Sequence, residues 1–135
     1  MIKFGEIKVG DYLMASYEGQ QFRGEVTNLQ KDAKQVCVNN GVQDFWFAPE
    51  HLHPIVLDDN AMHELNFTKE VAENGTVKYK KGAFRVLLSK EGDFSSSEIW
   101  YREDKRHNAA IEYMHQFQNM YYDMTKVHLT NEVMV

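Results

Sequence analysis

The sequence predicts an α+β protein in which a small β-barrel precedes a β-meander that is packed by two helices. Three observations favour this class. Residues 8–55 alternate in short apolar and polar runs, residues 69–101 do so again around further turn signals, and residues 108–125 repeat apolar side chains at helical spacing. We therefore expect two units, a barrel over 1–56 and an α+β subdomain over 57–135.

The first unit contains several short strand candidates separated by turn residues, which is typical of a small barrel or roll. Asn40-Gly41 lies between two of them, and both residues tolerate the positive φ angles of a type I′ turn. We expect a hairpin that pairs 35–39 with 42–47. In the aromatic run over 45–47, Trp46 should point to the opposite side of the strand from its two neighbours.

The order of these pieces resembles the SH3-like barrel family, which includes Tudor-type and KOW-type modules. The resemblance rests on Val9-Gly10-Asp11, on a second strand over 19–26, and on a helical turn and closing strand over 48–55. It implies a barrel whose exposed aromatic side chains bind peptides or methylated side chains. Tyr17 and Trp46 are the aromatic residues that we expect on such a surface, unless the C-terminal half covers the faces of the aromatic run over 45–47.

The second unit begins with a short helix over 59–66, for which Asp59 or Asn60 supplies the N-cap. Strands between 69 and 101 follow, and their alternation of apolar and basic residues predicts an antiparallel meander with one buried face. Three glycine-containing pairs mark turns between the strands: Asn74-Gly75, Lys81-Gly82 and Glu91-Gly92.

The last element is a helix over 108–125, with Asn108 as its N-cap, whose apolar stripe should pack across the meander. Its polar face carries amides, a histidine and a tyrosine in place of the usual lysine and glutamate. Two interpretations of this face stay open: its side chains form hydrogen bonds to the protein's own strand edges and turns, or they form a partner surface or an oligomer interface. The residues of this face are His115, Gln118, Asn119 and Tyr122.

This helix, together with the preceding segment over 54–67, is similar to a group of short uncharacterised proteins of bacterial phages, prophages and mobile elements. The shared motif is Tyr-x-His-Gln-x-Gln-Asn, which here spans 113–119. The resemblance implies an accessory protein of a phage or mobile element, and the group has no established activity to carry over to this chain.

Charge disfavours sequence-independent nucleic-acid binding outside a local basic patch, and the cysteine content excludes two kinds of site. The formal net charge is -5, with 5 Lys+Arg against 7 Asp+Glu in 1–56 and 10 against 13 in 57–135. Neither half has the basic character that sequence-independent nucleic-acid binding normally requires. The single cysteine, Cys37, excludes an intramolecular disulfide and a thiolate metal cage. We find no signal-peptide pattern and no membrane-spanning apolar run, so we expect a cytoplasmic protein without membrane contact.

We expect no enzyme activity, no cofactor and no metal. The chain lacks a phosphate-binding loop, a nucleophile elbow and a metalloprotease helix. Cys37 lies within an apolar strand candidate, where a buried thiol is expected and not a nucleophile. The spacing of His51 and His53 is not one of the strong zinc patterns.

The leading hypothesis is a noncatalytic adaptor or accessory protein that binds a protein partner, or its own copies, through Tyr17, Trp46 and the polar helix face. The alternative is nucleic-acid binding by basic residues with interleaved aromatic side chains. A minor alternative is a small-molecule or nucleotide binder with a pocket between the two units. The basic residues of the alternative are Lys78, Lys80, Lys81, Arg85, Arg102 and Arg106.

Overall fold

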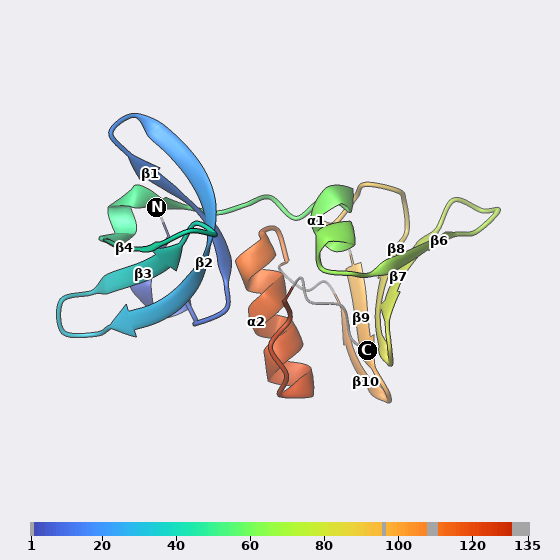
Figure 1. Cartoon of the computed structure of the whole chain (residues 1–135). Helices are drawn as coiled ribbons and strands as arrows, with labels where there is room; N and C mark the ends of the chain where they lie inside the picture. The colour runs from blue at the N-terminus through green and yellow to red at the C-terminus, as the bar shows by residue number, and fades with distance from the viewer. Residues whose placement is uncertain (1, 96, 108–110, 131–135) are drawn as a thin grey trace.

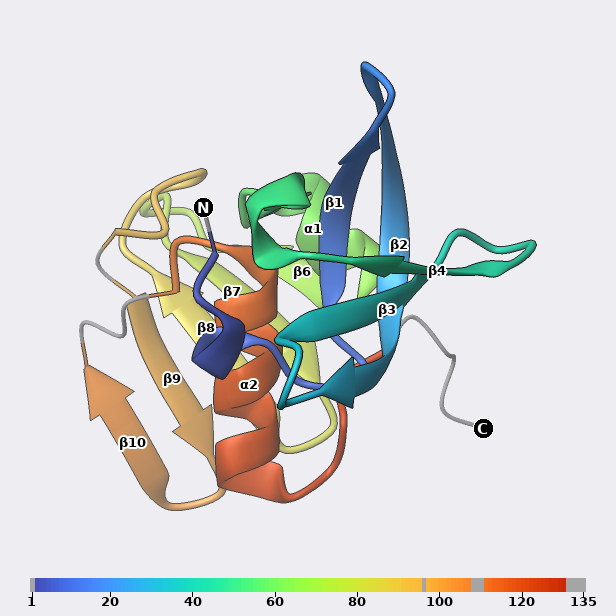
Figure 2. The same cartoon turned by 90° about the vertical axis from the view of Figure 1, so that its left-hand side faces the viewer.

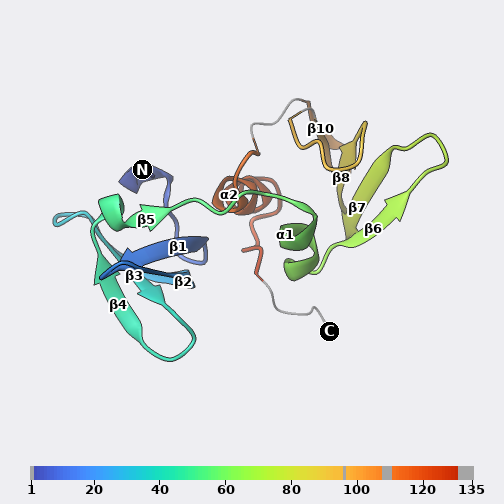
Figure 3. The ribbon, with the colours of Figure 1, turned by 90° about the horizontal axis from the view of Figure 1, so that it is seen from above.

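The computed structural model describes residues 2–95, 97–107 and 111–130. Two antiparallel sheets of five strands each lie on either side of helix α2 (Met114–Thr125), as Figure 1 shows. The view from above in Figure 3 shows the same arrangement of sheet, helix and sheet. The expected α+β class is confirmed.

The first sheet has the strand order β4-β3-β2-β1-β5, with β4 and β5 at its edges. No closed barrel is found among the described strands. Its elements are η1 (Phe4–Glu6), β1 (Tyr12–Tyr17), β2 (Gln20–Gln30), β3 (Gln35–Asn39), β4 (Asp44–Phe47), η2 (Pro49–His51) and β5 (Leu52–His53).

The β3–β4 hairpin forms as expected, but its turn lies one residue later than the sequence indicated. Asn39 pairs with Asp44, so Gly41 and Val42 form the turn in place of Asn40-Gly41. The reason is the Asn40 side chain, whose Oδ1 accepts hydrogen bonds from the Val42 amide at 2.9 Å and the amide of the next residue at 3.0 Å. A side chain that mimics the backbone in this way favours a turn after itself.

The aromatic run of β4 divides between two faces as expected. Phe47 pairs with Val36 and Phe45 with Val38, which places both rings on the core side of the sheet. Trp46 points the other way and is 47% exposed.

Gly24 of β2 lies close against β3. A Cβ atom at this position would collide with Val38 Cγ1 and would lie 2.7 Å from the backbone oxygen of Asn39. Backbone cannot move aside as a flexible side chain can, so Gly24→Ala should lower the free energy of unfolding by about 2 kcal/mol. Urea denaturation measures this, with Gly5→Ala as the control because a Cβ at Gly5 meets nothing within 4 Å. Equal stability of the two variants would contradict the proposed clash.

The second sheet is the expected meander, with the order β10-β9-β8-β7-β6. Its last strand was not predicted, because the sequence Asp104–His107 contains no apolar alternation. The elements are α1 (Asp59–Glu64), β6 (Thr68–Val71), β7 (Val77–Lys81), β8 (Phe84–Leu88), β9 (Ser97–Tyr101), β10 (Asp104–His107) and α2.

The N-cap of α1 is Asp58, one residue before the two candidates that the sequence suggested. Its side chain accepts a hydrogen bond from the Ala61 amide at 2.8 Å, which satisfies one of the free N–H groups of the first turn. The cap therefore starts the helix immediately after the linker between the two sheets.

Helix α2 begins at Met114, so the expected start near 108 is wrong. The segment before it is extended and pairs with the linker: Leu57 N–H donates to Glu112 O at 3.0 Å, and Met114 N–H donates to Ile55 O at 2.7 Å. Gln116 then accepts a hydrogen bond from the Tyr113 amide at 3.1 Å and closes the first turn. The expected cap, Asn108, lies outside the described residues.

Each sheet has a hydrophobic core of its own. Leu13, Val26 and Phe47 belong to the first core, and η1 covers one side of it and lies beside α2 (Figure 2). The second core fills the space between the meander and the two helices, and it contains the expected stripe of α2. Its buried side chains on that stripe are Met114, Phe117 and Tyr121, and Met124 is partly buried against them.

Candidate functional site

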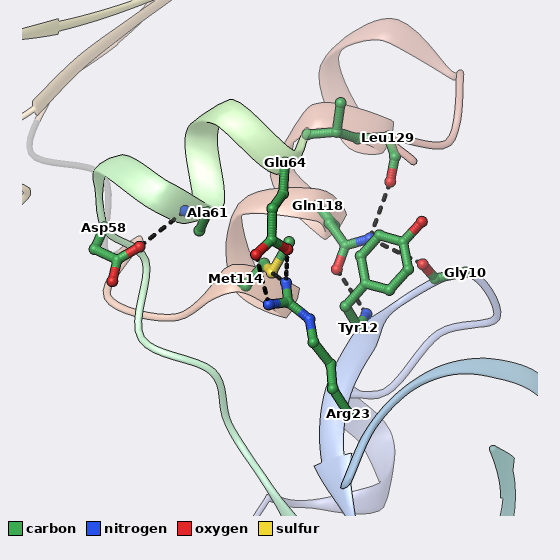
Figure 4. Close-up of polar contacts among 9 residues, drawn as sticks. All are labelled: Gly10, Tyr12, Arg23, Asp58, Ala61, Glu64, Met114, Gln118 and Leu129. Carbon is green, nitrogen blue, oxygen red and sulfur yellow. Dashed lines mark hydrogen bonds and ion pairs between the residues drawn. The ribbon is translucent and has the colours of Figure 1, made fainter. Parts of the chain in front are cut away.

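Gln118 lies at the junction of the two halves and is 3% exposed (Figure 4). Its Oε1 accepts a hydrogen bond from the backbone N–H of Tyr12 at 2.8 Å. Its Nε2 donates to the backbone oxygens of Gly10 at 2.8 Å and Leu129 at 2.9 Å. One side-chain amide therefore joins α2 to the start of β1 and to the segment after α2.

Asn119 makes a second polar contact across the same junction. Its Nδ2 donates to the backbone oxygen of Glu6 at 3.0 Å and to Asp11 Oδ2 at 3.2 Å. The backbone N–H of Lys8 donates to the same carboxyl oxygen at 2.9 Å. Desolvation by burial raises the pKa of Asp11 to about 7 in spite of these hydrogen bonds. The junction therefore contains a carboxyl group that changes charge near neutral pH.

Arg23 of β2 connects the first sheet to both helices (Figure 4). Its Nη1 donates to Glu64 Oε1 of α1 at 2.8 Å, and its Nη2 contacts the same carboxylate and donates to Met114 Sδ of α2 at 3.0 Å. Both charged side chains are partly exposed, so the ion pair contributes no more than about 1 kcal/mol. The pair joins α1 to β2 of the first sheet.

His115 is the remaining buried polar residue of the helix, at 1% exposure. Neither ring nitrogen has a hydrogen-bond partner among the described residues, and burial lowers the pKa of the imidazole. The ring stacks on Tyr113 with a centroid distance of 6.1 Å and an interplanar angle of 11°. It is therefore a neutral, packed side chain.

These contacts correct the interpretation of the polar helix face as a partner surface. His115 and Gln118 are buried and so out of reach of a partner, while Asn119 is partly buried and donates its Nδ2 to the first half. Hydrogen bonds to the protein's own backbone, the other of the two interpretations, describe Gln118 and Asn119. Only Tyr122 of the four stays exposed, at 42%, and it stacks on His128.

The two aromatic residues expected in the first half, Tyr17 and Trp46, line one hollow of about 680 Å³, which we call the aromatic groove. Tyr17 ends β1 and is 61% exposed. The groove lies between the β1–β2 turn, the start of β3 and η2. It is lined by Ser16, Tyr17, Glu18, Gly19, Gln35, Trp46, Phe47, Ala48 and His51.

Hydrogen bonds hold the two sides of the aromatic groove together. Ser16 Oγ donates to the backbone oxygen of His51 at 3.3 Å and lies 3.2 Å from His53 Nε2. The β1–β2 turn adopts left-handed backbone angles, with φ of 49° at Glu18 and 78° at Gly19. The turn brings one carboxylate to the same hollow as the two rings. Sequence reasoning did not select Glu18 or His51, because only the fold brings them beside Trp46.

The basic residues of the alternative hypothesis fall on two faces of the second sheet. Lys80 pairs with Arg85, and Arg85 pairs with Trp100, so these three side chains share the face that points away from the helices. Lys105 follows in the same row opposite Trp100, and Lys78 lies in the next row. Trp100 and Lys105 belong to the basic and aromatic stretch that the sequence indicated for this hypothesis, and the register of β8, β9 and β10 brings them beside Arg85.

The other basic residues serve the fold. Lys81 Nζ donates to the backbone oxygen of Leu65 at the end of α1 at 3.0 Å. Arg106 Nη1 lies 2.9 Å from Asp123 Oδ2 on α2. Both point to the helix side of the sheet, which corrects their assignment to a nucleic-acid site. Arg102 lies in the β9–β10 turn at a φ of 55°.

A second hollow, of about 570 Å³, lies beside the linker and the loop before β9, and not between the two sheets as the small-molecule hypothesis expected. Within the described part of the chain, no group of three or more His, Cys, Asp and Glu side chains is placed to hold a metal ion. None of the described helices has the length and apolar character needed to cross a bilayer.

Comparison of the chain with models of known protein families, with curated proteins and with solved structures finds no match.

Proposed function

We propose that this is a noncatalytic interaction protein that binds an extended peptide segment of a partner protein in the aromatic groove. The observation that carries the proposal is that Tyr17 and Trp46, far apart in the sequence, line the same hollow and remain exposed. Large aromatic side chains on a rigid scaffold are the groups that contribute most to protein recognition.

The chemistry of the groove favours a cationic side chain in the bound segment. Two aromatic faces attract a cation, and the Glu18 carboxylate adds an opposite charge at the rim. Trp46 and Tyr17 belong to strand ends, which are less mobile than loop tips, so little ordering should be needed on binding.

The resemblances in the sequence support a type of module and a biological context for this activity. We infer an SH3-like module in the first half, supported by the strand order and by the helical turn η2 before β5. The motif over 113–119 supports an accessory protein of a phage or mobile element that acts in the host cytoplasm.

A peptide-display selection tests the proposal. Random peptides selected on the immobilised protein should bind with micromolar affinity, and Trp46→Ala should weaken that binding about 30-fold, as loss of an aromatic hot spot does. Fluorescence anisotropy of labelled peptides measures the affinity.

The matched control is Val42→Ala, which removes an apolar side chain that is 89% exposed but lies in the β3–β4 turn, outside the groove. It should leave peptide affinity unchanged. The proposal fails if the selected peptides bind wild type, Trp46→Ala and Tyr17→Ala equally well. A second copy of the chain could occupy the groove instead of a partner. In that case sedimentation of the unliganded protein should show a self-associated species.

A further inference from the structure

The outer face of the second sheet carries a row of cations around one indole. The row crosses four strands and reads Lys80, Arg85, Trp100 and Lys105. The guanidinium carbon of Arg85 lies 5.4 Å from the Trp100 ring centroid, and Lys105 Nζ lies 4.7 Å from it on the next strand. Both distances are within the range of cation–π attraction.

The neighbouring residues leave part of this charge unneutralised. Lys105 lies 2.7 Å from Glu98 Oε1, and Lys78 lies 3.4 Å from Glu70 Oε2. Lys80 and Arg85 have no carboxylate partner among the described residues. The face therefore has a local positive charge on a chain whose formal net charge is -5.

Nothing in the described part of the fold covers this face. The helices pack on the opposite side of the sheet, against Tyr79, Val86 and Ile99. In Figure 3, α2 lies between the two sheets, so the outer face of β7–β9 points away from the first half. A ligand on this face would not compete with a peptide in the aromatic groove.

We propose that this face binds single-stranded nucleic acid. Lys80 and Arg85 contact phosphates, and the Trp100 indole, together with the planar guanidinium of Arg85, provides a stacking surface for bases. A sheet face that carries an aromatic ring among cations suits unpaired bases, because the bases of a duplex are stacked inside it. The proposal adds a second ligand to the proposed peptide-binding function and does not depend on it.

Anisotropy titration with labelled oligothymidine and oligouridine of about 20 nucleotides tests the proposal at low salt. Both should bind, and affinity should fall steeply as salt rises. Trp100→Ala should weaken binding about 10-fold, with Trp100→Phe retaining most of it. Lys80→Ala and Arg85→Ala should each lower the slope of log affinity against log salt by about 0.7.

A second readout uses Trp46→Phe, which leaves Trp100 as the only tryptophan, so oligonucleotide binding should quench the remaining fluorescence.

Lys31→Ala is the matched charge control, because Lys31 is exposed in the turn between β2 and β3 of the other half. The proposal is overturned if Lys31→Ala weakens binding as much as Lys80→Ala, or if Trp100→Ala and Trp100→Phe both bind like wild type. A duplex that binds as tightly as the single strand overturns it too, as does equal competition by polyglutamate, which would indicate an acidic peptide. Peptide binding should be unchanged in Trp100→Ala, so failure here leaves the groove proposal intact.

Discussion

Gln118→Ala should lower the free energy of unfolding by about 3 kcal/mol, because the side chain makes three hydrogen bonds in a buried site. The substitution removes the acceptor of the Tyr12 amide and the donor to two backbone oxygens. Each buried polar group that loses its partner costs about 1 to 3 kcal/mol, and entry of water reduces the total below the simple sum. Urea denaturation measures the difference.

A second readout separates this junction from general loss of packing. In Gln118→Ala the exchange of the Tyr12 amide should speed up by a larger factor than that of amides in β8 and β9, which change only with the global free energy of unfolding. Gln43→Ala, which removes an exposed glutamine side chain from the β3–β4 turn, should leave both stability and exchange unchanged. Wild-type protection of the Tyr12 amide in Gln118→Ala would show that the hydrogen bond does not hold the two halves together.

The junction explains why the polar helix face could be noticed in the sequence but not assigned. Helical spacing is a local property, so Phe117 and Tyr121 could be placed on the apolar stripe from periodicity alone. Whether Gln118 meets solvent, a partner or the protein's own backbone depends on the position of β1, more than a hundred residues earlier in the chain. A local sequence pattern gives no information about a contact between residues so far apart in the chain.

Element boundaries failed for the same physical reason. Residues 111–113 have helix-compatible spacing, yet they extend because the linker offers backbone partners at Ile55 and Leu57. Strand β10 was missed because it is held by pairing with β9 and has no buried alternation of its own. Tertiary hydrogen bonding overrides local preference at both places.

For the basic residues of the meander, the sequence did indicate which side chains share a face of the sheet. Side chains alternate along a strand, so Lys81 shares a face with Tyr79, and Lys80 does not. Strict use of this rule would have separated Lys81 from Lys78 and Lys80. It would not have placed Trp100 between Arg85 and Lys105, which requires the register of three strands.

The buried Asp11 carboxyl should make the protein less stable as pH rises from about 4 to 7. Its pKa is about 7 in the folded protein and 3.8 in a solvated chain, because burial disfavours the carboxylate. Between these values the unfolded chain has released the proton and the folded protein still holds it. The stabilisation is therefore complete below pH 4 and is lost as pH approaches 7, with a total change on the order of 4 kcal/mol.

Asp11→Asn isolates this contribution. The asparagine oxygen can still accept hydrogen bonds from the Lys8 amide and Asn119 Nδ2, but the side chain no longer titrates. Urea denaturation at several pH values should show that the variant loses the decline between pH 4 and 7, relative to wild type. The comparison with wild type is needed because other carboxyl groups also make stability depend on pH. Hydrogen bonds lower the pKa values of Asp59 and Glu98, so these two groups contribute stability that is lost as pH falls.

Asp32→Asn removes an exposed carboxyl from the turn between β2 and β3, so it should keep the wild-type pH dependence. Carbon NMR of the Asp11 carboxyl gives an independent measurement, with a midpoint expected near pH 7. A midpoint near the ordinary aspartate value would mean that water reaches the carboxyl and that Asn119 binds a solvated group. The junction would then be an open polar contact, and the same result would predict a smaller loss of stability for Gln118→Ala, because water could replace its hydrogen bonds.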